Sequence, residues 1–297
     1  MAGKQVTELD ALPSFTDTSL VPVHNGAGLK KGLLSQLANY LGTKFSNPNL
    51  LINPDFKINQ RGATSYEQRG YSVDRWKIWN VTVTPSTSGG ITVKNDKYSD
   101  TGNILQYLEN ATEGDSTLSC YVTSVSGTVT MVADDDSQVI LKQGLNVVHT
   151  SKSTKTFTIF LNRGTSITLK WVKLEQGKVA TEFIAPNYAE EILKCQRFYV
   201  VLEGSLAGYG ANNAIYIPFS RGVYMRSSRN VIFKGNNKQT FLRVNGTGKQ
   251  ISFSTNNGYA NDQYVRVYTN PVDTSLNNTA IGIDLNDVTI SVDAEIY

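Results

Sequence analysis

The chain has 297 residues, of which 18 % are charged and 40 % hydrophobic, and its formal net charge is +3. That length allows two or three compact domains, and a charge this small does not indicate a nucleic-acid partner. No apolar run approaches the roughly 20 residues that cross a bilayer, and no signal peptide is visible, so we expect folding in a cytoplasm without membrane insertion. Two cysteines, Cys120 and Cys195, are too few for a disulfide framework and are expected as buried free thiols.

Residues 1–45 form a separate small element by pattern. Short extended runs at 6–12 and 19–23 are broken by prolines and a glycine-rich turn. Leucines then recur at helical spacing over residues 30–42, and Gly42 stands where a helix would end. Such a short helix must bury its apolar stripe on something else, since it would be marginal alone.

Residues 46–186 carry closely spaced strand patterns. Apolar and polar residues alternate over 118–123, 156–161 and 167–171, and glycine turns separate the runs. Many short strands without long helices predict a jelly roll or β-sandwich. We expect Trp76 and Trp171 in its core, and Asp74 with Arg75 as an ion pair or as partners of the strand ends.

Residues 187–198 interrupt the β pattern with a predicted linking helix. Its apolar stripe comprises Tyr188, Ile192, Cys195 and Phe198, with acids early and bases late as the helix dipole prefers. Residues 199–297 return to strand patterns and predict a second, β-rich C-terminal domain. In its last strand, residues 288–296, the even positions are expected to face inward and the odd positions outward. The predicted fold class is therefore all-β.

No arrangement of residues indicates catalysis. The two histidines, His24 and His149, lack neighbours at metal-ligand or triad spacing, and no nucleotide, hydrolase or metal motif occurs. A carboxylate pair could still cleave a glycoside, but the acidic run 134–136 falls where a turn is expected. The sequence predicts that the chain is not an enzyme, with no catalytic residue, metal or cofactor.

The C-terminal domain contains the ingredients of a sugar site. Aromatic faces pack on the apolar faces of sugars, and amides or carboxylates satisfy the hydroxyl groups. Residues 255–264 form the best candidate loop, in which the expected contacts are Tyr259, Asn261, Asp262, Tyr264, Asn256 and Asn257. Four further tyrosines of the region could also contact a sugar: Tyr209, Tyr216, Tyr224 and Tyr268. The alternative is that all of these are ordinary strand and turn residues.

Two signatures resemble a module of phage and prophage tail-fibre proteins. The first is Asn49–Gly62 followed by Tyr71–Trp76; the second is Trp171–Gly177, Phe183–Pro186, Glu190–Glu191 and Cys195–Tyr199. They resemble the opening and the close of a carbohydrate-module-like jelly roll. Later segments, 218–226 and 291–297, resemble the tip of such fibres, although the family's proline near 229 is missing here.

The N-terminal segment resembles the attachment element of phage fibres, and this implies docking on another virion protein. The resemblance assigns attachment to Leu9, Leu12, Leu33, Leu37 and Leu41. It also implies a homotrimer, in which avidity strengthens weak contacts.

The resulting hypothesis is a structural virion protein, a fibre that binds a host-surface receptor without cleaving it. The expected receptor is a glycan. One alternative is a purely architectural protein, such as a head fibre, capsid decoration or baseplate component. The other is a fibre that degrades polysaccharide.

Overall fold

The computed structural model describes residues 19–24, 29–34, 36–37, 46–67, 69–98, 100–202, 204–211, 214–218, 224–226, 230–235, 239–244, 247–252, 258–261, 263–268, 274–284 and 288–295. Near the N-terminus, β1 (Leu20–His24) pairs antiparallel with β2 (Leu29–Leu33). The predicted helix over 30–42 is therefore wrong at its start, because residues up to Leu33 complete a hairpin. Helical residues begin at Leu34 and include Leu37.

Residues 70–176 form two facing antiparallel sheets, which we call the jelly-roll region. One sheet has the order β10-β9-β12-β7-β4-β3, and the other has the order β11-β8-β13-β6-β5. In chain order the strands are β3 (Gly70–Tyr71), β4 (Lys77–Trp79), β5 (Thr82–Pro85), β6 (Ile91–Asn95), β7 (Gly102–Tyr107), β8 (Ser116–Ser126), β9 (Val129–Val132), β10 (Gln138–Ile140), β11 (Gly144–Thr150), β12 (Thr156–Leu161) and β13 (Thr165–Gln176). The predicted jelly-roll or β-sandwich class is confirmed.

The core between these sheets follows the alternation seen in the sequence. Leu118, Cys120 and Val122 of β8 point inward, as do Phe157 and Ile159 of β12, and all are fully buried. Trp76 is also buried, as predicted. Both cysteines are free and buried, and burial raises the pKa of the Cys120 thiol to about 12.

Trp171 does not lie in the core, and this corrects the prediction. Leu169 of β13 pairs with Val122, but Trp171 pairs with the next residue of β8, Tyr121, so Lys170 is an extra residue at a β-bulge. Beyond the bulge the alternation of core-facing and outward-facing positions along β13 is shifted by one residue. Leu169 and Val172 therefore both face the core, while Trp171 lies partly exposed on the outer face.

The predicted linking helix is confirmed as α2 (Tyr188–Gln196). Asn187 caps it, because its side-chain oxygen accepts a hydrogen bond from the Ala189 amide at 2.9 Å. The predicted apolar stripe is only partly correct. Cys195 is buried, but Tyr188 is exposed, and the buried face includes Glu191, which accepts a hydrogen bond from the Asn53 amide.

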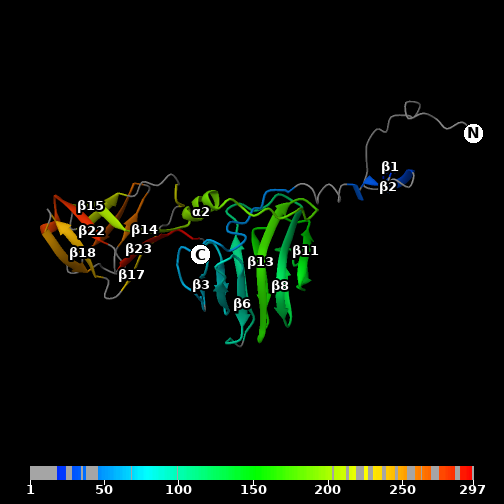
Figure 1. Cartoon of the computed structure of the whole chain (residues 1–297), viewed down its shortest axis with the longest axis horizontal. Coiled ribbons are helices and arrows are strands. Elements are labelled where there is room, and N and C mark those ends of the chain that lie inside the picture. The colour runs from blue at the N-terminus through cyan, green and yellow to red at the C-terminus, as the bar shows by residue number, and fades with distance from the viewer. Residues whose placement is uncertain are drawn as a thin grey trace, which may run out of the picture.

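The chain from Tyr199 onward forms two further antiparallel sheets, the C-terminal region, with α2 between it and the jelly roll (Figure 1). The sheet orders are β14-β23-β17 and β19-β18-β22-β15-β16-β21-β20. A 3-10 turn, η2 (Thr274–Leu276), precedes β22, and the strands are β14 (Tyr199–Leu202), β15 (Ser205–Ala211), β16 (Ala214–Pro218), β17 (Asn230–Gly235), β18 (Gln239–Val244), β19 (Thr247–Ser252), β20 (Tyr259–Ala260), β21 (Tyr264–Tyr268), β22 (Thr279–Asp284) and β23 (Val288–Asp293).

From Ile290 onward β23 and the two residues after it are buried on both faces, which corrects the prediction of an outward polar face for Ser291, Asp293 and Glu295. Thr289, on the same polar side, is exposed. Ile290, Val292 and Ala294 belong to the core of the C-terminal region, but Asp293 and Glu295 are buried as well. The reason is that β23 is the central strand of its sheet, and its polar side chains lie against charged residues of the jelly-roll region.

Candidate functional site

Four side chains form a continuous row across the outer face of the large C-terminal sheet. Antiparallel pairing sets Tyr209 of β15 opposite Tyr216 of β16, Tyr216 opposite Arg266 of β21, and Arg266 opposite Tyr259 of β20. Residues directly opposite in adjacent strands share a face of the sheet. Tyr209 and Tyr259, at the two ends of the row, are each 48 % exposed.

Two more tyrosines border this row. Tyr264 lies at an aromatic edge-to-face distance of 5.1 Å from Tyr216, between ring centroids, and 6.3 Å from Tyr259. The Arg266 guanidinium lies over the rings of Tyr259 and Tyr268, 5.5 and 5.2 Å from their centroids. We call these six residues, Tyr209, Tyr216, Tyr259, Tyr264, Arg266 and Tyr268, the tyrosine face.

Buried residues on the opposite side of the same strands anchor the tyrosine face. Ile215, Ile217, Val265 and Val267 alternate with the tyrosines and are completely buried. A hydrogen bond with Tyr216 also raises the pKa of Arg266, which keeps a fixed positive charge in the middle of the face. The arrangement offers aromatic surfaces, phenol hydroxyls and one cation, which can pack on a sugar ring and satisfy its hydroxyl groups.

The predicted loop residues divide into three groups. The structure brings Tyr259 and Tyr264 together on the tyrosine face. Asn261 holds the turn between β20 and β21, because its side-chain oxygen accepts hydrogen bonds from the amides of Gln263 and Tyr264, both at 2.8 Å. Asn256, Asn257 and Asp262 lie outside the described residues.

Sequence reasoning missed Arg266, and it counted Tyr209 and Tyr216 among the aromatic residues of a sugar site without placing them beside the loop 255–264. A signal for Arg266 was present: residues 264–268 alternate Tyr, Val, Arg, Val, Tyr, which places the arginine on the tyrosine side. The row itself depends on the pairing of four strands that are separated in the sequence, and a single sequence does not specify that pairing.

The first sequence signature folds into a compact polar loop. Asn53 donates from its amide group to the carbonyls of Ile58 and Asp74, and its side-chain oxygen accepts from the Ile58 amide. The Trp76 indole donates to the Asn53 carbonyl at 2.9 Å and packs on Phe56. The Asn-Pro-Asp-Phe run and the Val-Asp-Arg-Trp step are therefore two halves of one buried unit.

The second signature is also occupied by internal contacts. Lys173 and Glu175 of β13 are buried and form an ion pair at 3.2 Å, and the Lys173 ammonium donates to the hydroxyls of Ser46 and Thr181. The Asn49 side chain bonds the backbone of Val172 and Leu174. These contacts fasten the segments before and after the jelly-roll strands to β13.

Arg75 joins the jelly-roll region to the C-terminal region. Its guanidinium forms a buried ion pair with Glu295, donates to the Tyr107 carbonyl at 2.7 Å, and lies 3.6 Å from the Phe198 ring centroid. Asp74 and Arg75 are therefore not partners of one another, and the expectation of an ion pair between them is wrong. The reason is that Arg75 adopts a positive φ of 73°, and its side chain reaches the other region.

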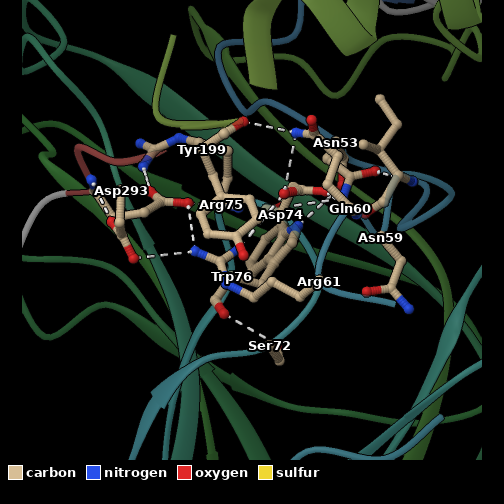
Figure 2. Close-up of polar contacts among 12 residues, drawn as sticks. Asn53, Asn59, Gln60, Arg61, Ser72, Asp74, Arg75, Trp76, Tyr199 and Asp293 are labelled. Carbon is tan, nitrogen blue, oxygen red and sulfur yellow. Dashed lines mark hydrogen bonds and ion pairs between the residues drawn. The ribbon is translucent and has the colours of Figure 1, made fainter. Parts of the chain in front are cut away.

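Arg61 is the second arginine of this buried network, which Figure 2 shows. It lies 3.4 Å from the Asp74 carboxylate, 3.5 Å from Glu295 and 3.7 Å from Asp293. It also stacks 3.9 Å above the Tyr199 ring centroid.

Asp74 is a buried acid of this network. It accepts a hydrogen bond from the Gln60 amide at 2.7 Å. Burial raises its pKa to about 7, against the opposing pull of Arg61. The network thus has a group that changes protonation near neutral pH, at the boundary between the two regions.

Acidic side chains of the jelly-roll region hold loops and a helix end together. Asp134 accepts hydrogen bonds from the Thr156 amide at 3.1 Å and from the amide of Lys155, and the run 134–136 forms the predicted turn. Glu109 receives two hydrogen bonds from the Arg197 guanidinium, at 2.8 and 3.0 Å. Within the described residues, no three His, Cys, Asp or Glu side chains lie together as a metal site, and no helix there could span a bilayer.

Comparisons with known proteins give little guidance. No protein-family model matches the chain, and no curated protein matches it. A salicylate 1,2-dioxygenase from Pseudaminobacter salicylatoxidans aligns with 68 % of this chain and 72 % of its own, at 8 % identity and a TM-score of 0.11. A deletion mutant of Bacillus subtilis oxalate decarboxylase aligns with 82 % of this chain and 80 % of its own, at 8 % identity and a TM-score of 0.15.

These neighbours are enzymes, and they contradict the prediction that this chain is not one. The exclusion of catalysis therefore does not stand and is corrected here. At identities below 10 % the likeness concerns only the β fold, and TM-scores of 0.11 and 0.15 carry no argument for a dioxygenase or decarboxylase activity.

Proposed function

We propose that this chain is a virion fibre protein that attaches to a host-surface glycan through the tyrosine face of its C-terminal region. The observation that carries the proposal is the row of Tyr209, Tyr216, Arg266 and Tyr259 in direct register, with its end members half exposed. Exposed tyrosines grouped on one rigid sheet provide contact area at low entropic cost. The resemblance of the two signatures to phage fibre proteins supports the same proposal.

Adsorption competition with the purified full chain tests this function. Wild-type protein, added to the parent phage and its host, should reduce adsorption. Tyr259→Ala and Tyr264→Ala should each weaken competition by about tenfold, because a lost aromatic contact costs about 1.4 kcal/mol.

Tyr188→Ala is the matched control, since Tyr188 is an exposed tyrosine on α2, outside the tyrosine face. It should compete like the wild type. Unchanged adsorption with folded wild-type protein would reject receptor binding and favour the architectural alternative.

For the N-terminal segment we propose attachment to another virion protein and assembly into a homotrimer. Leu20 and Leu33 lie directly opposite in the β1–β2 hairpin and are 58 % and 37 % exposed, and Leu37 is 39 % exposed. Burying these leucines between copies would remove apolar surface from water. Leu9, Leu12 and Leu41 lie outside the described residues.

Light scattering after size exclusion tests the assembly. The wild type should run as a trimer, and Leu33→Ser with Leu37→Ser should shift it to smaller species. A wild type that is monomeric at high concentration would contradict the proposal.

A further inference from the structure

A pocket of about 360 Å³ opens on the outer face of the β5–β6–β13–β8 sheet, away from the tyrosine face. Its floor contains three threonine hydroxyls, from Thr92, Thr123 and Thr168. Thr92 and Thr168 lie opposite each other in register, with their hydroxyls 3.1 Å apart, and the Thr123 hydroxyl donates to the Thr168 carbonyl. The floor is therefore a fixed group of hydroxyls on paired strands.

The β-bulge at Lys170 supplies the aromatic wall of this pocket. By reversing the phase of β13 it turns Trp171 outward, where the ring stacks on Phe183 with centroids 4.6 Å apart and planes 2° from parallel. Tyr121 pairs with Trp171 across β8 and β13, 6.1 Å away between ring centroids, and does not line the pocket. β-bulges beside binding sites commonly change the direction of a side chain. Here the bulge places the Trp171 indole outside the core, where it forms one wall of the pocket.

The opposite rim is a tight loop whose backbone is held by close contacts. The Gly90 amide donates to the Asp55 carbonyl at 2.8 Å, and a Cβ at Gly90 would lie 2.6 Å from the Leu169 carbonyl oxygen. The Ser86 and Ser88 hydroxyls contact each other at 3.0 Å along this rim. The pocket is therefore formed before any ligand arrives.

The charge of the lining is unbalanced. Lys57 forms an ion pair with Asp55 at 2.8 Å, so these two charges cancel. Lys170 also lines the pocket, and its ammonium lies over the Tyr121 ring, 5.8 Å from the centroid. In the part of the chain that the structure describes, no carboxylate forms an ion pair with Lys170. The pocket thus has one more positive charge than negative.

We infer that this pocket is a second saccharide site, which takes one pyranose ring that carries a carboxylate. The aromatic wall packs on the apolar face of the ring, the threonine hydroxyls bond its hydroxyl groups, and Lys170 receives the carboxylate. The volume lies at the lower end of the roughly 300–1,000 Å³ found for small-molecule sites, which suits one ring. This inference does not rest on the tyrosine face, because the two sites lie in different regions of the chain.

Calorimetric titration of the full chain tests the site with matched probes. The probes are the methyl glycosides of glucuronic, galacturonic and N-acetylneuraminic acids, and the neutral methyl glucoside and methyl galactoside. At least one acidic glycoside should bind saturably, about tenfold more tightly than the neutral probes. Lys170→Gln should weaken that binding by about tenfold, and Thr168→Val should weaken it by about fivefold.

Lys94→Gln is the matched charge control, because Lys94 is an exposed lysine on β6 that does not line the pocket. It should bind like the wild type. Absence of saturable binding below about 10 mM overturns the inference, as does equal affinity for acidic and neutral probes. Binding that Lys170→Gln and Trp171→Ala both leave unchanged also overturns it.

Discussion

In the jelly-roll region and the loop that precedes it, the buried charged side chains of the sequence signatures point inward or toward the boundary with the C-terminal region. Arg61 contacts Asp293 and Glu295, Arg75 contacts Glu295, and Lys173 contacts Glu175. In the C-terminal region the tyrosines and Arg266 point outward and belong to no signature. In this chain the recognisable motifs therefore hold the fold together, whereas the surface able to bind a ligand is assembled from residues that are scattered in the sequence.

Removal of the buried arginine at the boundary should have the largest effect on stability. Arg75→Met leaves Glu295 buried with only its longer contact to Arg61, 3.5 Å away, and should cost about 3–5 kcal/mol in free energy of unfolding, measured with urea. The exposed turn residue Arg163→Met is the control and should change stability little.

A second variant separates the lost ion pair from lost packing. Arg75→Met with Glu295→Leu removes both charges, so it should recover part of the stability that the single variant loses. If Arg75→Met lowers the free energy of unfolding by less than about 1 kcal/mol, the boundary does not depend on this ion pair.

The boundary should also respond to pH through Asp74. Its native pKa of about 7 lies above its ordinary value of 3.8, so the native state binds the proton more tightly than the unfolded state. The contribution of this group is full below pH 4 and is lost as the pH rises through 7, by on the order of 2–4 kcal/mol. Unfolding at pH 5.5, 7 and 8.5 should therefore show lower stability at the alkaline end.

Asp74→Asn should flatten that decline, because an amide does not titrate. Asp136→Asn, in an exposed turn, serves as the control and should keep the slope of the wild type. An equal slope in the Asp74→Asn variant and the wild type would assign the pH dependence to other groups.

The tyrosine face depends on a close approach beneath it. A Cβ at Gly210 of β15 would lie 1.8 Å from the Leu276 carbonyl oxygen, so Gly210→Ala must displace the strand that carries Tyr209. We expect a loss of about 1–3 kcal/mol in stability, together with weaker glycan binding in the adsorption assay. Ala207→Ser, at an exposed position of the same strand, should change neither.

The smallest expected effect concerns the cap of α2. Asn187→Ala removes the side-chain acceptor of the first helical turn and should cost about 1 kcal/mol by thermal unfolding. Asn187→Asp retains an acceptor and should remain close to the wild type. If the Asp variant loses as much as the Ala variant, the cap is not the reason.

Prediction from sequence succeeded where one local rule decided the outcome. The alternation in β8 and β12 and the helical spacing of α2 depend on neighbours in the sequence, and these elements were placed correctly. It failed for Trp171, because one extra residue at the bulge reverses the alternation. It failed for Asp293 and Glu295, because the second face of β23 is buried by the distant residues Arg61 and Arg75.

The candidate site was found in part for the same reason. The loop 255–264 stood out by composition, and it led to Tyr259 and Tyr264. The neighbours that complete the tyrosine face come from β15 and β16, whose pairing with β21 is a property of the whole sheet.

The position of β23 has a consequence during synthesis. Tyr199 starts β14 but pairs with Asp293, so that sheet waits until nearly one hundred further residues (293 − 199 = 94) have been made. The jelly-roll strands meanwhile are complete, and domains generally fold as units in order of synthesis. Until β23 has been synthesised, Arg61, Asp74 and Arg75 lie on a surface that the C-terminal region does not yet cover. A charged surface of this kind stays hydrated, whereas an exposed apolar surface would promote aggregation of nascent chains. We therefore expect the half-made protein to remain soluble on the ribosome.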